Sequence, residues 1–218
     1  MALAIFDLDH TLLQGDSDYE WGRFLVRLGV VDGETYERTN LAFYEQYKAG
    51  TLDIHEFARF AFRPLAENPV AQLQAWRVQF MEEVILSMIS AGSRDLLDTH
   101  RGRGDTLLII TATNRFVTEP IARELGVDHL LATDPEFHGG RYTGRIAGVP
   151  CFREGKVTRL QQWLEEHGRN LQDSWFYSDS HNDLPLLELV DHPVAVDADE
   201  PLTRIAGERG WRTLSLVG

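Results

Sequence analysis

Two carboxylates close the first apolar run of the chain, in the sequence Ile5-Phe6-Asp7-Leu8-Asp9. Leu3 to Phe6 predict a buried strand, and the two-residue period of a strand directs Asp7 and Asp9 to the same side. Ionised carboxylates placed in this way repel each other, and burying them is costly unless a cation lies near them. The pair is typical of a metal or catalytic site, although a strand that simply ends, with Asp9 capping a turn, has the same residues.

Polar residues also follow two later apolar runs, each predicted to be a buried strand. Thr106–Thr111 ends in a hydroxyl side chain, and Thr113 and Asn114 come directly after it. The acidic and amide side chains that follow the run Ser174–Ser178 are Asp179, Asn182 and Asp183. In an open parallel sheet, ligands bind at the carboxyl ends of the strands. The three strand ends are therefore predicted to form one polar site.

The composition indicates a globular protein that acts on neither nucleic acid nor membrane. The chain has 218 residues, of which 43% are hydrophobic and 25% charged, and its formal net charge is -13. Nucleic-acid binding usually needs a basic face, and an anionic membrane surface would repel this chain. An acidic protein can still bind an anionic substrate where a metal ion or a local Lys or Arg compensates.

The single cysteine, Cys151, excludes an intrachain disulfide and favours a cytoplasmic location. We expect a packed thiol, because no neighbouring base is evident that would activate it. Residues Met1 to Phe6 are too short and too quickly acidic for a signal peptide. No apolar run approaches the roughly 20 residues that a membrane helix needs. The sequence thus predicts a soluble, cytoplasmic protein.

The segment after the first motif has the apolar spacing of helices, with Gly or Pro at the breaks. The predicted helices are Asp18–Gly29, Asp32–Gly50, Asp53–Phe62 and Pro69–Ser90. Aromatic residues of two of these helices form stripes that we interpret as core rather than as ligand contacts. These residues are Phe43, Tyr44, Tyr47, Phe57 and Phe60.

From Ala91 onward, short apolar strands alternate with helices, which is typical of a parallel sheet with helices on both faces. A short strand is predicted at His129–Thr133, followed by a hairpin over Glu136–Ile146, where Gly139-Gly140 marks the turn. The predicted fold class is α/β, with a Rossmann-like parallel sheet core and an inserted α-helical cap domain. The core comprises residues 1–13 and 90–218. The cap comprises residues 14–89 and is expected to lie beside the strand ends, where it determines substrate specificity.

The order of these motifs resembles that of the haloacid dehalogenase superfamily. The motifs are Asp7-x-Asp9-x-Thr11, the strand ending in Thr111, then Lys156, then Asp179-Ser-His-Asn-Asp183. The helical insertion after the first motif is similar to that of the phosphoserine phosphatase-like branch. The resemblance covers nearly the whole chain, and it rests on four motifs in the right order rather than on one.

The resemblance implies hydrolysis of a phosphate monoester through an aspartyl-phosphate intermediate. Asp7 would be the nucleophile that attacks phosphorus. Asp9 would protonate the leaving alcohol and then take a proton from the hydrolytic water. Thr111 and Lys156 would donate to the transferring phosphoryl group, whose oxygens carry the charge of the transition state. Asp9 also favours a phosphatase over a dehalogenase, because carbon–halogen cleavage needs no protonated alcohol.

The resemblance further implies Mg2+ as cofactor. Its ligands would be the Asp7 side chain, the Asp9 backbone carbonyl and Asp179, with Asp183 in support, since Mg2+ prefers oxygen ligands. Such an ion would explain why two carboxylates close one strand.

Several residues are candidates for contacts with the substrate. Phosphoserine phosphatases have a Glu at the position of Asp16 and use it to hold the substrate ammonium, and Asp16 fits the same role. Asp18 and Trp21 would add a charge and an aromatic face for a cationic group, although Asp18 would also serve as a helix cap. Further candidates after the later strands are Thr113, Asn114 and Asn182, the last as a phosphate or cap contact.

Two departures from the phosphoserine phosphatase pattern bear on the substrate. Thr111-Ala112-Thr113 stands in place of Ser-Gly-Gly, and Ser180-His181-Asn182 in place of Gly-Ala-Asn. A small ester with an amine and no carboxylate fits better, and the chain is also similar to the histidinol-phosphatases of the superfamily. We therefore expect histidinol phosphate as substrate, with phosphoserine or another small phosphomonoester as the alternative. A phosphotransferase and a non-catalytic phosphate-binding module also stay open, and the sequence leaves the oligomeric state undetermined.

Overall fold

The computed structural model describes residues 2–217, and this part of the chain forms one seven-stranded sheet. The strand order is β4-β3-β2-β1-β5-β6-β7, and all neighbours are parallel except the antiparallel pair β3 and β4. The strands are β1 (Leu3–Phe6), β2 (Thr106–Asn114), β3 (His129–His138), β4 (Arg141–Ala147), β5 (Trp175–Ser178), β6 (His192–Val196) and β7 (Arg212–Leu214). The predicted α/β class is confirmed.

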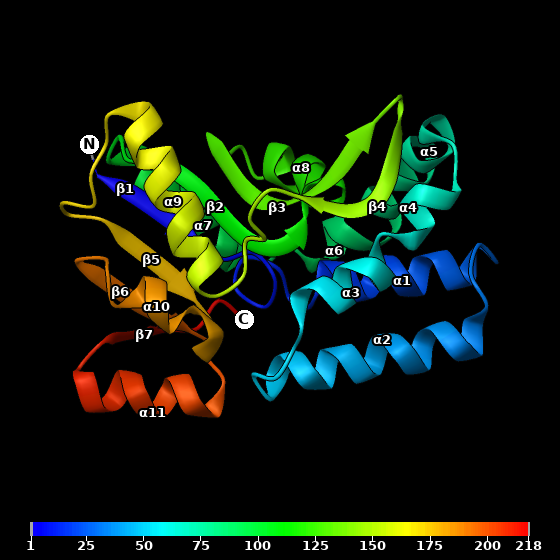
Figure 1. Ribbon diagram of the computed structural model, residues 1–218. Coiled ribbons are helices and arrows are strands. Elements are labelled where there is room, and N and C mark those ends of the chain that lie inside the picture. The colour runs from blue at the N-terminus through cyan, green and yellow to red at the C-terminus, as the bar shows by residue number, and fades with distance from the viewer. Residues whose placement is uncertain (1, 218) are drawn as a thin grey trace.

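Helices cover both faces of the sheet (Figure 1). Apolar side chains of α7 and α8 pack into one core cluster, and those of α9, α10 and α11 into a second. These helices are α7 (Ala91–Gly102), α8 (Arg115–Glu124), α9 (Glu154–His167), α10 (Leu184–Leu187) and α11 (Glu200–Arg209). Cys151 belongs to the second cluster, where burial raises the pKa of its thiol to about 12, as expected for a packed cysteine.

Strand β1 lies between β2 and β5, and all four of its residues are buried. Its last residue, Phe6, pairs with Ile109 of β2 and with Tyr177 of β5. A strand buried on both faces is apolar throughout because helices lie above and below it. The chain leaves the three strands at one edge of the sheet, and the predicted motif residues lie there.

Residues 14–89, which we call the insertion, form helices to one side of the sheet (Figure 1). They are α1 (Ser17–Arg27), α2 (Gly33–Lys48), α3 (Ile54–Ala61), α4 (Arg63–Glu67), α5 (Val70–Phe80) and α6 (Leu86–Met88), with a π-helical turn at Met81–Ile85. The two ends of the insertion meet, since Leu13 bridges to Ile89 and Gln14 N donates to Met88 O at 2.8 Å. The contact between the two ends supports the division into core and cap, which stays a prediction. Residues 1 and 218 lie outside the described residues.

The first three helices of the insertion begin at aspartates. The side chains of Asp16, Asp32 and Asp53 accept hydrogen bonds from backbone N–H groups of the first turns of α1, α2 and α3. Such caps satisfy amides that have no partner within the helix.

The predicted helix Pro69–Ser90 is interrupted by the π-helical turn. Helix α4 was not predicted, because its five residues are too few for an apolar period to show.

The predicted hairpin is present, but its first strand is longer than expected. Strand β3 runs without a break to the turn at Gly139 and Gly140, whose φ angles are 59° and 79°. Two successive positive φ angles suit glycine and the tight turns of hairpins. Strand β4 contacts α3 and α4, so the hairpin packs against the insertion.

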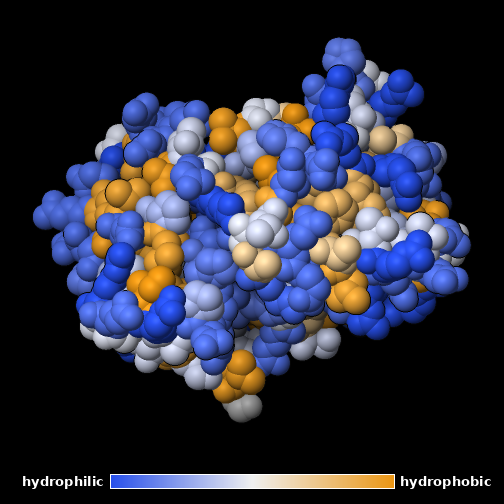
Figure 2. All heavy atoms as spheres, turned by 60° about the horizontal axis from the view of Figure 1, so that its bottom comes forward, coloured by the Kyte–Doolittle hydropathy of each residue, from blue (hydrophilic) through white to orange (hydrophobic). Residues whose placement is uncertain are grey.

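The face of the molecule in Figure 2 is mostly hydrophilic, with apolar residues in small groups among charged ones. Within residues 2–217, no helix is both long and apolar enough to cross a membrane.

Candidate active site

Lys156 connects the first and last motifs. Its Nζ donates to Asp7 Oδ1 at 2.7 Å and to Asp183 Oδ2 at 2.8 Å, and the lysine side chain is 3% exposed. Asp7 follows β1, Asp183 follows β5, and Lys156 lies in the first turn of α9. A lysine that opens an amphipathic helix is usually solvated, but here three separate segments enclose it.

The three groups shift one another's proton affinity. Burial raises the pKa of Asp7 to about 7; the charge of Lys156 acts against this rise, and that of Asp183 adds to it. Burial alone would lower the pKa of Lys156, but the carboxylates of Asp183 and Asp7 raise it above its usual value. The lysine is therefore charged, and its positive charge stabilises the ionised form of Asp7.

Asp179 is the next carboxylate at this edge. Thr11 Oγ1 donates to Asp179 Oδ1 at 3.1 Å and accepts from Asp179 N, also at 3.1 Å, so the first motif orients the last. Burial raises the pKa of Asp179 well above its usual value, and the charges of Asp7 and Asp183 raise it further.

The donor set fits a bound Mg2+ ion. The carboxylates of Asp7 and Asp183 are buried and that of Asp179 is half-buried, and Lys156 pairs with the first two only, which leaves negative charge uncompensated. In the described part of the chain, no three Asp, Glu, His or Cys side chains converge as a complete metal-binding set. Mg2+ usually keeps several waters and takes only one or two carboxylates from the protein. The predicted ligands, which are the Asp7 side chain, the Asp9 carbonyl and Asp179, agree with this coordination preference.

The Asp9 side chain is held on both of its oxygens. Oδ1 accepts from Ser17 N, the first residue of α1, at 2.6 Å, and Oδ2 accepts from Thr113 Oγ1 at 2.8 Å. Thr113 N in turn donates to Thr111 Oγ1 at 3.1 Å. The carboxylate is therefore fixed between the insertion and the end of β2, and it does not cap a turn within its own loop.

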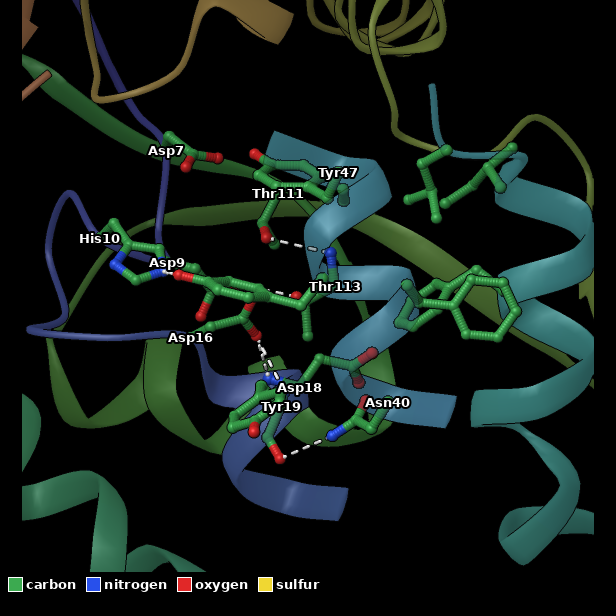
Figure 3. Close-up of a pocket in the computed structure, with 16 residues that line it drawn as sticks. Asp7, Asp9, His10, Asp16, Asp18, Tyr19, Asn40, Tyr47, Thr111 and Thr113 are labelled. Atoms are coloured by element: carbon green, nitrogen blue, oxygen red, sulfur yellow. Dashed lines mark hydrogen bonds between the residues drawn. The ribbon is translucent and has the colours of Figure 1, made fainter. Parts of the chain in front are cut away.

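A cavity opens between these strand ends and the insertion (Figure 3). Its core side is lined by Asp7, Asp9, His10, Thr111, Ala112 and Thr113. The insertion contributes two further acidic residues, Asp16 and Asp18, together with Tyr19, Asn40, Phe43, Tyr44, Tyr47, Leu52, Ile54 and Phe57. None of the lining residues that the structure describes is Lys or Arg.

Asp16 and Asp18 both face the cavity, but each also has a structural partner. Asp16 Oδ1 accepts from the backbone N–H groups of Asp18 and Tyr19 and thereby caps α1. Asp18 Oδ1 accepts from Asn114 Nδ2 at 2.9 Å. Burial, with the charge of Asp9 second, raises the pKa of Asp18 to about 7 and that of Asp16 well above its usual value. Asp16 is thus the helix cap, a role that the sequence left open for Asp18.

Three predicted substrate contacts lie away from the cavity lining. Trp21 is 2% exposed and packs against Phe24, Phe80 and Phe116, so it is a core residue; the prediction that it presents an aromatic face to the substrate is wrong. Asn114 caps α8 and holds Asp18. Asn182 donates through Nδ2 to Tyr47 O at 3.0 Å, which makes it a contact to the insertion.

The sequence missed much of the cavity wall. Phe43, Tyr44, Tyr47 and Phe57 were assigned to the core, but the structure places them on the cavity. Phe60 does pack on the core. An aromatic stripe on a helix shows that one face avoids water, but it does not show whether that face meets other side chains or a ligand.

Comparison with known proteins places the chain in a family. The sequence model of the haloacid dehalogenase-like hydrolases matches residues 4–188. The chain is 44% identical over 217 residues to a protein named histidinol-phosphatase from Neisseria meningitidis serogroup C, with 98% of each chain covered. It is 35% identical over 216 residues to phosphoserine phosphatase SerB1 of Mycobacterium tuberculosis, covering 96% of this chain and 69% of the relative.

Solved structures agree on the fold. A protein of unknown function from Bordetella pertussis Tohama I superposes with a TM-score of 0.93 at 48% identity, covering 99% of this chain and 98% of that one. A phospho-aspartyl intermediate analogue of phosphoserine phosphatase superposes with a TM-score of 0.72 at 18% identity, covering 98% and 92%. At that identity the second likeness concerns the fold alone.

The α/β core, the buried Asp7–Lys156–Asp183 cluster and the helical insertion are those of a phosphate-ester hydrolase. The chain belongs to the haloacid dehalogenase-like hydrolase family, and it is a phosphatase. The prediction of this family and of its phosphoserine phosphatase-like branch is confirmed.

Proposed function

We propose that this phosphatase hydrolyses histidinol phosphate, with Mg2+ as cofactor and an aspartyl phosphate on Asp7 as intermediate. The observation that carries the proposal is the acidic lining of the cavity: Asp9, Asp16 and Asp18 line it, and no described Lys or Arg does. The ammonium group of the substrate would favour the ionised forms of Asp16 and Asp18, whose pKa values burial raises in its absence. The name of the Neisseria meningitidis relative supports the same choice.

The apolar wall of the cavity suits a flat aromatic group next to the amine. Phe43 and Phe57 meet edge to face at 5.4 Å between ring centroids, and Tyr19 and Tyr44 lie 5.5 Å apart. Aromatic side chains bind ring systems by their faces and edges, and they bind cations by their faces. The imidazole and the ammonium of histidinol phosphate match these two features.

Phosphoserine is the weaker candidate because its carboxylate would need a cation. A carboxylate brought close to Asp16 and Asp18 would meet no ammonium or guanidinium group, and among the described lining residues His10 is the only basic side chain. Burial lowers the pKa of His10 below its usual value, which leaves this imidazole neutral at physiological pH.

The reaction would proceed in two displacements at phosphorus. Asp7 attacks the phosphorus atom, the ester P–O bond breaks, and Asp9 gives its proton to the departing alcohol oxygen. Water then attacks the phosphorus of the aspartyl phosphate, Asp9 takes a proton from that water, and Asp7 and inorganic phosphate are released. Lys156 and Thr111 donate to the phosphoryl oxygens. Bound Mg2+ would supply charge stabilisation to the same oxygens.

Phosphate release from a panel of monoesters tests the proposal. The panel contains histidinol phosphate, phosphoserine, glycerol phosphate and sugar phosphates, each assayed with Mg2+ and with chelator. We expect metal-dependent turnover with histidinol phosphate preferred by at least about tenfold in kcat/KM, the value of one well-made charged contact. A preference for phosphoserine would contradict the substrate assignment. An acceptor alcohol in the same assay separates hydrolysis from phosphoryl transfer. A cytoplasmic location remains part of the proposal.

A further inference from the structure

Tyr47 brings a hydroxyl from the insertion into the group of catalytic carboxylates. It lies in the last turn of α2 and lines the cavity, and Figure 3 shows its hydroxyl on the side of the ring that faces Asp7. Burial raises the pKa of this phenol well above its usual value, and the charges of the Asp179, Asp7 and Asp183 carboxylates raise it further. Tyr47 thus brings a polar atom of the aromatic wall toward the phosphoryl-binding end of the cavity.

The core holds the backbone around Tyr47 through two side chains. Asn182 Nδ2 donates to Tyr47 O at 3.0 Å, and Arg153 Nη2 donates to Gly50 O. Arg153 Nε donates to Asn182 Oδ1 at 3.1 Å, so the two side chains support each other. The C-terminal end of α2 carries the negative end of its helix dipole, which a guanidinium stabilises. Gly50 admits this close approach, since a Cβ there would lie 3.1 Å from Arg153 Nη2.

Arg153 has an unfavourable backbone conformation. Its φ is 50° and its ψ is -121°, a combination that residues other than glycine rarely adopt. It lies directly before α9, and its carbonyl accepts from Lys156 N at 2.9 Å. Strain of this kind persists where the surrounding structure enforces it, and it often accompanies function. Here it directs one guanidinium to the insertion from the turn that also positions the catalytic lysine.

We propose that Tyr47 is a catalytic residue whose hydroxyl donates a hydrogen bond to the transferring phosphoryl group, and that Arg153 and Asn182 are its positioning residues. A phenol is protonated at neutral pH and is therefore a donor. Donors directed at the phosphoryl oxygens stabilise the charge of the transition state. The site would then be complete only while the end of α2 is docked on the core. This inference rests on the phosphatase reaction of the proposed function, but not on histidinol phosphate as substrate.

The test uses Tyr47→Phe, Arg153→Gly and their combination, with Tyr36→Phe as control. Tyr36 lies on the same helix but outside the cavity lining, and it packs against Phe60. Each protein is assayed on p-nitrophenyl phosphate and on histidinol phosphate, and its melting temperature is measured. Because glycine tolerates a positive φ, Arg153→Gly removes the guanidinium without adding strain to the fold.

We expect Tyr47→Phe to lower kcat about tenfold to a hundredfold on both esters, with KM changed little, because every substrate presents the same phosphoryl group. Tyr36→Phe should leave kcat unchanged. Arg153→Gly should lower kcat/KM in the Tyr47 protein at an undiminished melting temperature, and should have little further effect in the Tyr47→Phe protein.

Three results would overturn the inference. If kcat is unchanged in Tyr47→Phe, Tyr47 has no catalytic role. If the substitution only raises KM for histidinol phosphate, Tyr47 contacts the alcohol part of the substrate and not the phosphoryl group. If Arg153→Gly lowers kcat/KM by the same factor in the Tyr47 protein and in the Tyr47→Phe protein, Arg153 does not act through the phenol. A wild-type enzyme that turns over p-nitrophenyl phosphate but not histidinol phosphate contradicts the proposed substrate, and the same variants then test Tyr47 on the first ester alone.

Discussion

The ammonium of Lys156 lies 2.7 Å from the Asp7 carboxylate, and both side chains are almost wholly buried. The pair joins residues 149 positions apart in the sequence, and its geometry leaves the second Asp7 oxygen free of Lys156. Asp183 receives the same ammonium on both of its oxygens, at 2.7 and 2.8 Å. One cation therefore holds the proposed nucleophile, Asp7, and the last motif in a fixed relation.

Replacing this lysine tests how much the cation contributes. Lys156→Met retains the length of the side chain but leaves buried carboxylates without their partner. Such a loss typically costs about 3–5 kcal/mol of unfolding free energy, and losing a donor to the phosphoryl group costs on the order of a hundredfold or more in kcat. Denaturant unfolding at pH 7.5 and steady-state kinetics measure the two effects. Lys48→Met, at an exposed site on α2, is the stability control and should shift unfolding by no more than about 0.5 kcal/mol. A fully active Lys156→Met protein would contradict the assigned role.

Mg2+ should stabilise the fold as well as support turnover. A cation that binds the native protein only raises stability by mass action, about 2.7 kcal/mol at a hundredfold excess over Kd. We expect chelator to abolish phosphate release and Mg2+ to raise the melting temperature of the wild-type protein. Asp179→Asn should lose most of that rise, because it removes a proposed ligand and retains the side-chain shape. A melting temperature that responds to Mg2+ equally in both proteins would place the ion elsewhere.

The stability of the protein should depend on Asp18 in a pH-dependent way. Burial, followed by the charge of Asp9, raises the pKa of Asp18 from 3.8 to about 7. Between these two values the folded state binds more protons than the unfolded state, so this group's contribution to stability falls as pH rises. Asp18→Asn removes the effect and retains an acceptor for Asn114. The variant should be more stable than wild type by on the order of 4 kcal/mol at pH 8, with the difference vanishing near pH 4. Thermal melts across this range provide the measurement.

The same substitution should lower the activity on phosphate esters that carry an amine. Asp18→Asn should lower kcat/KM for histidinol phosphate about tenfold or more, since a charge-assisted contact is lost. On p-nitrophenyl phosphate, which has no amine, the change should be small. A gain in stability together with a selective loss of activity is typical of binding sites that hold uncompensated charge. Equal losses on both esters would argue that Asp18 only supports the fold.

The candidate catalytic edge was predictable because its residues are neighbours of the strands. Asp7, Thr111 and Asp179 each end or directly follow a buried apolar run, and parallel strands bring their carboxyl ends together. Lys156 was less certain, since its burial depends on where α9 packs. Only the order of the motifs marked it as part of the site.

The specificity wall was not predictable in the same way. Trp21 and Tyr44 both lie on aromatic helix faces of the insertion, yet one is buried in the core and the other lines the cavity. The difference arises from how the helices of the insertion pack against their neighbours, which the helical period does not encode. The contact between Asn114 and Asp18 spans 96 residues and has no local signature either.

Asp9 should be required less for the first displacement when the leaving group needs no proton. Its oxygens are fixed by Ser17 N and Thr113 Oγ1, so Asp9→Asn retains the shape of the site but removes the acid and base. p-Nitrophenolate leaves readily without protonation, whereas attack by water on the aspartyl phosphate still needs a base. Mixing Asp9→Asn with p-nitrophenyl phosphate should therefore release a burst of p-nitrophenolate approaching one equivalent per enzyme, followed by turnover about a hundredfold slower than wild type.

The burst also separates the two carboxylates of the first motif. Asp7→Asn has no nucleophile and should show neither burst nor turnover, while its unfolding transition stays cooperative. Histidinol phosphate has an alkoxide leaving group that must be protonated, so Asp9→Asn should give no burst with that ester. A burst of equal size with both esters would mean that another group protonates the leaving oxygen, and the role of Asp9 would then be confined to activating water.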